Sequence, residues 1–476
     1  MQTIEKKSNQ KTWSKAISQP ANEFPPTQLP VLAGKIPNRL RGTLYRNGAG
    51  RLERGNIPVG HWFDGDGAIL AVHFTDAGAT GVYRYVQTAG YQEETAAGKF
   101  LYGNYGMTAP GAIWNQWQKP VKHSANTSVL ALPDKLLALW EGDNPYALDL
   151  QTLETQGLDN LAGLEKKQPY SAHPKVDYAT GEIFNFGMSP GTNAILHIYK
   201  SDLTGKVFKK AKFTLEGFPV IHDFVLAGQY LVFFASAVRL NIWPVLFGTS
   251  SYSDSLTWQP EKGNQIVVID RETLSVVSRG ETEPWFQWHF GNGYVDDSGM
   301  VIVDFAKYAD FQTNEFLREV ATGKTQTVAK TTLTQVRLNP QTGKVRGIET
   351  LLDRNCEFPS VPAKNVSKFS PCSYMSIFRE GTEAGEILNN IARFDYQTAT
   401  FTEAYLGENR YPSEPIHVQD PQNPDQGWIL TVVYDGNTNN SEVWVFASQG
   451  LNDEPVCKLG LPSVIPHSFH GTWKPG

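Results

Sequence analysis

The chain has 476 residues, of which 40% are hydrophobic, and its 42 basic and 48 acidic residues give a net charge of −6. This length supports a large buried core, and the absence of a basic excess argues against a nucleic-acid-binding protein. The N-terminus lacks the apolar core of a signal peptide, and no segment has the ~18 apolar residues of a membrane-spanning helix. Three widely spaced cysteines without a Cys-x-x-Cys pair favour free thiols in a reducing compartment over a thiolate zinc site. We therefore expect a cytoplasmic protein that lies, at most, on a membrane surface.

Residues 1–30 are polar and contain several prolines, so we expect a flexible N-terminal extension. Short alternating or continuous apolar runs follow, and turns rich in Asp, Asn and Gly separate them. Helical patterns are rare, and 106–122 and 237–260 are the best candidates for helical or loop excursions. The predicted strands are 68–74, 81–86, 128–132, 135–140, 181–186, 194–199, 230–235, 265–269, 300–305, 332–338, 373–378, 427–433 and 442–446.

Three segments share a polar turn followed by a short strand: 149–157, 270–280 and 339–347. They resemble a decayed hairpin repeat in which each unit closes with the same kind of turn. Many short strands at regular spacing are typical of a sandwich, a barrel or a propeller. Seven blades would take roughly sixty residues each, somewhat more than in compact propellers, and the excess would form loops on one face. We expect one all-β domain over 1–476.

Four of the ten histidines stand in distinctive local contexts: His173 in SAHPKVD, His222 in FPVIHDF, His289 in WHFGNGY and His470 in FHGTW. The gaps between them are 49, 67 and 181 residues, so no two can share a helix turn. Such residues meet only in a closed fold, and the inner strands of a propeller surround one axis. Four neutral imidazoles suit a borderline divalent metal such as iron or zinc. A hydrogen-bonded or surface role remains the simpler interpretation of each histidine taken alone.

Carboxylates occur in apolar, strand-like surroundings at Glu141, Glu357 and Glu414. A metal-bound imidazole usually donates its other N–H to a carboxylate, and a carboxylate in an apolar run is costly unless it is paired. The alternative is that each lies at a strand end and faces water. The FDGDG motif contains Asp64 and Asp66, which we interpret as turn and blade-closure residues because Asp side chains bond nearby backbone N–H groups.

Several ordered motifs carry a family resemblance: GTLYRNGAG (42–50), HWFDGDGAI (61–69), ANTSV (125–129), LLALWEGDNPYALD (136–149), the four histidine contexts, EFPSVP and SEPIHV. With them the chain resembles the carotenoid cleavage oxygenases over essentially its full length, and most closely the cyanobacterial apocarotenoid oxygenases that form retinal. The resemblance implies a seven-bladed β-propeller with a helical and loop cap over an axial metal site. It also implies one Fe(II) per chain, with O2 as co-substrate.

The same resemblance implies roles for individual residues. His173, His222, His289 and His470 would bind the iron, and Glu141, Glu357 and Glu414 would orient three of these histidines. His173 would lack a carboxylate partner. Thr127 matches a threonine whose methyl group crowds an open coordination position. The substrate tunnel would be lined by Trp140, Phe63, Tyr308 and Phe469.

The expected reaction is cleavage of a C=C bond in a carotenoid or apocarotenoid with O2, giving aldehydes, with retinal formed from β-apocarotenals. A long polyene offers few hydrogen-bonding groups, so an apolar tunnel with aromatic walls would bind it by burial. One alternative is a stilbene- or phenylpropanoid-cleaving oxygenase of the same family. A second is a non-enzymatic ligand-binding propeller, in which the histidines would be structural.

Two apolar segments, 109–120 and 239–248, predict peripheral contact with membrane lipid. Amphipathic aromatic residues partition into the lipid interface, and nearby Lys or Arg can reach the headgroups. The alternative is that these side chains are buried in the cap. The residues expected to contact lipid are Trp114, Trp117, Trp243 and Phe247.

Overall fold

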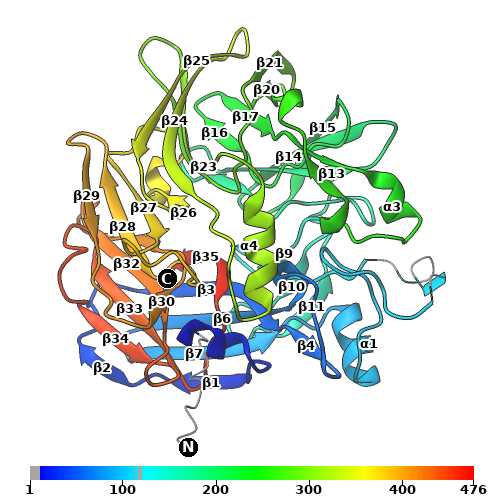
Figure 1. The fold of residues 1–476 in the computed structure, drawn as a ribbon. Coiled ribbons are helices and arrows are strands. Elements are labelled where there is room, and N and C mark those ends of the chain that lie inside the picture. Colours follow the sequence, from blue (N-terminus) through cyan, green and yellow to red (C-terminus); the bar gives the residue numbers. More distant parts are fainter. Residues whose placement is uncertain (1–10, 113, 116–118, 120) are drawn as a thin grey trace, which may run out of the picture.

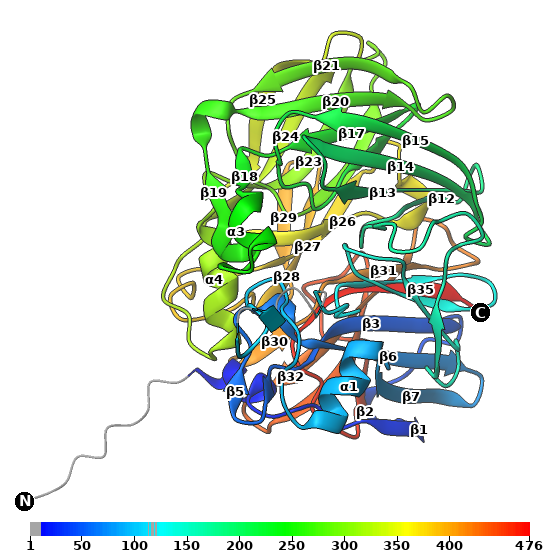
Figure 2. The same cartoon turned by 90° about the vertical axis from the view of Figure 1, so that its right-hand side faces the viewer.

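The computed structural model describes residues 11–112, 114, 115, 119 and 121–476. In this part of the chain, seven antiparallel sheets of four to six strands surround a common axis (Figures 1 and 2). The predicted seven-bladed β-propeller is therefore confirmed.

Two neighbouring blades combine strands from both ends of the chain, so hydrogen bonds between the N- and C-terminal parts close the ring. One contains, in order, β1 (Phe24–Gln28), β7 (Gly78–Tyr85), β6 (Asp66–Thr75), β3 (Gly42–Arg51) and β35 (Ser468–Pro475). The other contains β2 (Val31–Gly34), β34 (Cys457–Gly460), β33 (Asn440–Ala447), β32 (Gly427–Asp435) and, both paired with β32, β30 (Arg410–Pro412) and β31 (Ile416–Gln419).

The other five blades have four strands each, in simple order from the axis outward. They are β8 (Ser128–Ala131), β9 (Leu136–Leu139), β10 (Tyr146–Leu148) and β11 (Thr155–Leu158); β12 (Lys175–Asp177), β13 (Glu182–Ser189), β14 (Ala194–Asp202) and β15 (Val207–Leu215); β16 (Val225–Ala227), β17 (Tyr230–Ala235), β20 (Asn264–Asp270) and β21 (Val276–Thr282); β22 (Phe290–Val295), β23 (Val301–Tyr308), β24 (Thr331–Asn339) and β25 (Lys344–Leu352); β26 (Cys356–Ser360), β27 (Cys372–Ile377), β28 (Asn390–Asp395) and β29 (Thr400–Glu403).

Short helices and hairpins lie outside the blades. They are η1 (Thr12–Ile17), β4 (Glu53–Arg54) with β5 (Ile57–Pro58), η2 (Trp62–Asp64), α1 (Ala89–Ala97), β18 (Val238–Leu240) with β19 (Leu256–Trp258), α3 (Ile242–Leu246), η3 (Ser253–Ser255), η4 (Pro260–Lys262), α4 (Gln312–Ala321) and η5 (Ala363–Asn365).

Burial explains why the strands differ in sequence pattern. Each blade packs against a neighbour on both faces, so central strands such as β17 and β32 are buried at every position and read as continuous apolar runs. The outermost strand β15 alternates between partly buried and exposed positions because one face meets water. The core therefore consists of apolar layers between blades, and one of these layers joins the sheet of β13 and β14 to that of β17 and β20.

The repeated polar turn occurs at the same place in successive blades, between the third and fourth strands. Asp149 and Asp270 each accept backbone N–H groups two and three residues later, and Asn339 does the same. Asp395 makes the same turn in a fourth blade, although its segment was not recognised in the sequence. The short polar side chain supplies the acceptor that reverses the chain, so the repeat reflects turn chemistry.

The N-terminal segment corrects one expectation. Residues 12–28 do not form a flexible extension: Trp13 is fully buried, its indole N–H donates to the Gly385 carbonyl, and β1 pairs with β7. Buried Trp13 and the strand pairing hold this segment in place. The prediction of flexibility was based on the average polarity of the segment.

Helix α4 was not predicted, and it lies across the face where the inner strands begin (Figure 1). Its first residue follows Phe311, which provides no side-chain cap, and the start signal is one residue further upstream, where Asp310 accepts the backbone N–H of Gln312. Phe316 and Leu317 pack into a buried cluster, and this tertiary packing stabilises the helix. Residues 237–260 form the predicted excursion, with α3, η3 and the hairpin of β18 and β19.

The FDGDG motif runs from η2 into β6, inside the blade that also contains β3 and β35, and Asp66 does more than shape a turn. Asp64 accepts N–H groups from His61 and Gly106, and burial raises its pKa to about 7 despite these bonds. Asp66 is buried and forms ion pairs with Arg54 and Lys122 at 2.7 Å each. The motif therefore contributes a buried charge network that ties β6 to the loop before β8.

Candidate metal centre

The four predicted histidines lie at the axial end of four inner strands. His173, His222 and His289 lie one to three residues before β12, β16 and β22, and His470 is the third residue of β35. These histidines are far apart in sequence but close in space, because every inner strand of the propeller starts near the axis. One ligand atom from each histidine lies within 4.8 Å of the others, and all four residues are buried.

Three of the imidazoles contact a carboxylate with the nitrogen that faces away from the cluster centre. Nδ1 of His222 lies 2.5 Å from Glu141 and that of His289 lies 2.6 Å from Glu357. Nδ1 of His470 lies 3.0 Å from Glu414. In the described residues His173 has no such partner, as the resemblance implied.

The proton positions indicate that a cation fits this cluster. A carboxylate accepts, so His289 and His470 each donate their Nδ1–H outward and present a bare lone pair at Nε2. Those two Nε2 atoms lie 3.0 Å apart, and Nε2 of His173 lies 2.9 Å from that of His222. Facing lone pairs at this distance repel unless positive charge lies between them. A divalent metal bound by four neutral imidazoles meets this requirement.

The pKa values show that protonation is disfavoured at two of the four imidazoles and favoured at a third. Burial and the neighbouring imidazoles hold the pKa of His173 well below its ordinary value. Burial lowers the pKa of His470 to about 4, although Glu414 opposes this shift. Burial also lowers the pKa of His222, but the charge and hydrogen bond of Glu141 outweigh it and raise the net value.

The three glutamates differ in the groups that donate hydrogen bonds to them and in their exposure. Glu414 also accepts from Arg46 at 2.8 Å and from the backbone N–H of Gly471 at 2.9 Å. Burial alone would raise the pKa of Glu414, yet His470 and Arg46 lower it to about 2. Glu357 accepts from the Tyr308 hydroxyl and the backbone N–H of Phe358. Glu141 is 42% exposed at its side chain and is therefore the most solvent-accessible of the three carboxylates.

Two supporting residues were missed in the sequence. Arg46 is 1% exposed, and its guanidinium also donates to Ser468 and to the carbonyl of Phe469. Asp223 is 2% exposed; it pairs with Lys175 at 2.7 Å and accepts from the backbone N–H of Phe290 at 3.0 Å. Asp223 thereby ties together the three strands that carry His173, His222 and His289. An acidic residue directly after His222 was the available signal.

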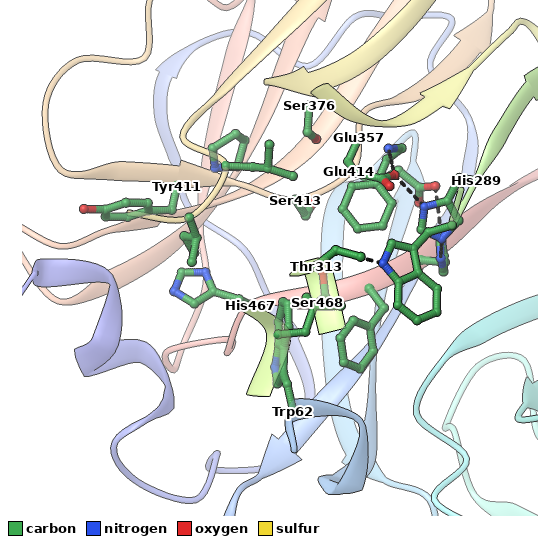
Figure 3. A pocket seen from close by; sticks show the side chains of 18 of the residues that line it. Trp62, His289, Thr313, Glu357, Ser376, Tyr411, Ser413, Glu414, His467 and Ser468 are labelled. Atoms are coloured by element: carbon green, nitrogen blue, oxygen red, sulfur yellow. Dashed lines mark hydrogen bonds and ion pairs between the residues drawn. The ribbon is translucent and has the colours of Figure 1, made fainter. Parts of the chain in front are cut away.

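An apolar cavity opens beside the histidines and extends away from them toward Tyr411 and His467 (Figure 3). Phe63, Tyr308, Phe469 and Thr127 are among the residues that line it; their roles toward substrate and metal stay predictions. Tyr308 also orients Glu357, a contact that the prediction of a substrate-facing ring did not anticipate.

Trp140 does not line this cavity; its ring packs against His123 with centroids 4.9 Å apart. Its proposed tunnel role therefore stays a prediction. Trp114, Trp243 and Phe247 are exposed by 59%, 63% and 58%, so they are not buried cap residues. Trp117 lies outside the described residues. Within the described chain, no helix combines the length and apolar character needed to cross a bilayer.

The three cysteines, Cys356, Cys372 and Cys457, are free and buried, as expected. Burial raises the pKa of the Cys457 thiol to about 11, and that of Cys356 is also raised, so neither thiolate forms at neutral pH.

Comparison with known proteins gives the same assignment throughout the chain. The family described as retinal pigment epithelial membrane protein (RPE65) matches residues 17–475. Apocarotenoid-15,15'-oxygenase of Synechocystis sp. is 31% identical, with 92% of this chain and 91% of that protein covered. Resveratrol cleavage oxygenase 1 of Aspergillus fumigatus is 28% identical (93% and 91% covered), and isoeugenol monooxygenase of Pseudomonas nitroreducens is 27% identical (93% of each).

A solved structure agrees with this assignment. The structure of cobalt-substituted Synechocystis apocarotenoid oxygenase superimposes with a TM-score of 0.87 at 30% identity, and 98% of each chain is covered. The chain belongs to the RPE65 family of carotenoid oxygenases.

Proposed function

We propose that the protein is a non-haem Fe(II) oxygenase that uses O2 to cleave a C=C bond of a carotenoid or apocarotenoid into aldehydes. Retinal formed from β-apocarotenals is the expected product. The observation that carries this proposal is the set of four convergent imidazoles, three of them held by carboxylates, at the end of an apolar cavity.

Iron is the metal that this chemistry calls for. Bound Fe(II) supplies the O2 chemistry that protein side chains cannot perform alone. His173, His222, His289 and His470 would hold it. Three glutamates outside the ligand set hold the Nδ1 protons of their histidines, which fixes the ring orientation and increases the basicity of Nε2.

Other residues of the cavity would bind the substrate and shield an open coordination position. Phe63, Trp288 and Phe469 form an aromatic wall, with ring centroids 5.6 Å apart for Phe63 and Trp288 and 5.5 Å for Phe63 and Phe469. Such a wall holds a flat polyene and excludes water. Thr127 donates its hydroxyl to Asn126 at 3.2 Å, which leaves its methyl group as the part available to crowd an open coordination position.

The test is an aerobic assay of purified protein loaded with Fe(II). We expect about one iron per chain, and aldehyde products from β-apocarotenals of several lengths, identified by mass spectrometry. Resveratrol and isoeugenol are the comparison substrates, because two relatives are named for activity on them. Cleavage of these two with intact apocarotenals would favour the phenylpropanoid alternative. A protein that neither binds iron stoichiometrically nor consumes O2 would be a non-enzymatic propeller.

We also propose that the protein is cytoplasmic and contacts membrane lipid through one face. Helix α3 presents Trp243 and Phe247, whose rings stack with centroids 6.2 Å apart. The loop that leads toward Trp114 contacts the segment after α3, because the backbone N–H of Ser253 donates to the carbonyl of Tyr105 at 2.7 Å. Exposed aromatic residues grouped on one face suit the boundary between lipid headgroups and acyl chains.

Replacing both Trp243 and Phe247 by serine is expected to weaken binding to phosphatidylcholine liposomes severalfold, because it removes most of the exposed apolar area of α3. Cosedimentation with liposomes measures this. Phe208→Ser is the control, since Phe208 is 55% exposed on strand β15 of a different region. If the wild-type protein stays in the supernatant, the membrane proposal is wrong.

A further inference from the structure

A serine hydroxyl in the cavity wall has no hydrogen-bond partner. Ser376 lies on β27, lines the cavity and is 1% exposed. Among the described residues nothing bonds its Oγ. A buried hydroxyl without a partner is costly, so an alanine would be the more stable choice at this position. The serine is explained if a bound molecule supplies the missing partner.

Ser376 lies across the β26–β27 ladder from a residue of the metal centre. In the ladder between β26 and β27, Ser376 stands directly opposite Glu357, the carboxylate that orients His289. Directly opposite residues project to the same face of a sheet, with Cβ atoms about 5 Å apart. In Figure 3 the Ser376 hydroxyl points from the upper wall into the space above Ser413.

A second group without a partner defines the chemistry of the ligand. Trp62 lines the same cavity, is 8% exposed, and leaves its indole N–H without an acceptor. Trp62 lies on the opposite wall in Figure 3. An indole N–H can only donate and a serine hydroxyl can donate, so both groups suit an acceptor oxygen.

We propose that Ser376 determines specificity by donating a hydrogen bond to an oxygen function of the substrate, a carbonyl or a hydroxyl. This inference rests on the proposed function, because it concerns the substrate of the same site. A hydrocarbon of the same shape leaves Ser376 without a partner, so the cavity selects against it. The oxygen can belong to the end of a polyene chain or to a phenol.

The experiment measures binding to the full-length, Fe(II)-supplemented protein without O2, so that turnover does not interfere. Quenching of tryptophan emission reports the affinity for three polyenes of equal length that end in an aldehyde, a primary alcohol or a methyl group. We expect the wild-type protein to bind the two oxygenated compounds about tenfold more tightly than the hydrocarbon, the cost of one unmade buried hydrogen bond. Ser376→Ala should reduce this preference to within about twofold.

Ser373→Ala is the matched control. Ser373 is a buried serine on the same strand, but an odd number of residues away, so its side chain projects to the other face and accepts from the Tyr396 hydroxyl. Ser373→Ala should keep the tenfold preference. Because Ser376→Ala removes an unpaired hydroxyl, we expect its melting temperature to equal or exceed that of the wild type.

A propenylphenol and its deoxy analogue form a second pair, and the pair with the larger Ser376-dependent preference identifies the source of the oxygen. Equal wild-type affinities within both pairs, or a preference that Ser376→Ala retains, would overturn the inference. The separate aerobic assay distinguishes the two proposals: a Ser376-dependent binding preference without product refutes only the proposed function.

Discussion

Replacing His289 by alanine is expected to lower the affinity for Fe(II) more than about 100-fold and to abolish turnover, while the chain stays folded. Loss of an outer carboxylate already costs 10- to 100-fold in metal affinity, and loss of a ligand removes a bond to the metal itself. The variant also leaves Glu357 without its imidazole partner at 2.6 Å. Titration with Co(II), followed by visible absorption, measures affinity independently of activity, and circular dichroism reports the fold.

His197→Ala is the control for this experiment. His197 lies on β14, is not one of the four clustered histidines, and contacts the Ser189 hydroxyl at 3.0 Å. Its removal should leave metal affinity and turnover within about twofold of the wild type. Retention of full Co(II) affinity by His289→Ala would refute the ligand role of His289.

Replacing Arg46 by methionine is expected to destabilise the protein by about 3–5 kcal/mol, because it leaves the buried carboxylate of Glu414 without its cation. Methionine keeps much of the side-chain volume, so the effect reports mainly the lost charge and hydrogen bonds. Urea denaturation at pH 7 measures the free energy of unfolding. Arg337→Met removes a half-exposed ion pair with Asp296 and should cost less than about 1 kcal/mol.

The difference in unfolding free energy between the wild type and Arg46→Met should change with pH in one direction. In the wild type, His470 and Arg46 hold the pKa of Glu414 at about 2, below its ordinary value of 4.5. A lowered pKa gives stability that is present above the ordinary value and is lost as the pH falls toward 2. The stability gap between wild type and Arg46→Met should therefore narrow as the pH falls from 4.5. A gap that stays constant over this range would contradict the assigned role of Arg46.

The fold and the ligand set were predictable from the sequence on different grounds. Period-2 apolar patterns and Asx turns are local, so the blades and their turns were predictable from residues such as Asp149 and Asp270. Spacing alone left the ligand role of the four histidines open, and the family resemblance was needed to group them. Their convergence depends on ring closure, which no local pattern encodes.

The supporting contacts were harder to predict. Arg46 lies 368 residues from Glu414, and nothing in the GTLYRNGAG segment indicates an ion pair with it. Helix α4 and the docking of Trp13 likewise depend on tertiary contacts that override weak local signals. Trp140 illustrates the reverse case: its motif matched the family, yet its ring packs on His123 and not on the cavity.

The closing strand β35 has a consequence for how the protein acquires its metal. It carries His470, and it pairs with β3 from the opposite end of the chain. During synthesis on the ribosome, the other three ligands emerge long before this strand does. A metal ion held by all four histidines could therefore bind only after β35 has reached its place. It would then link β35 to the segments before β12, β16 and β22, so removal of the metal is expected to loosen the C-terminal strand.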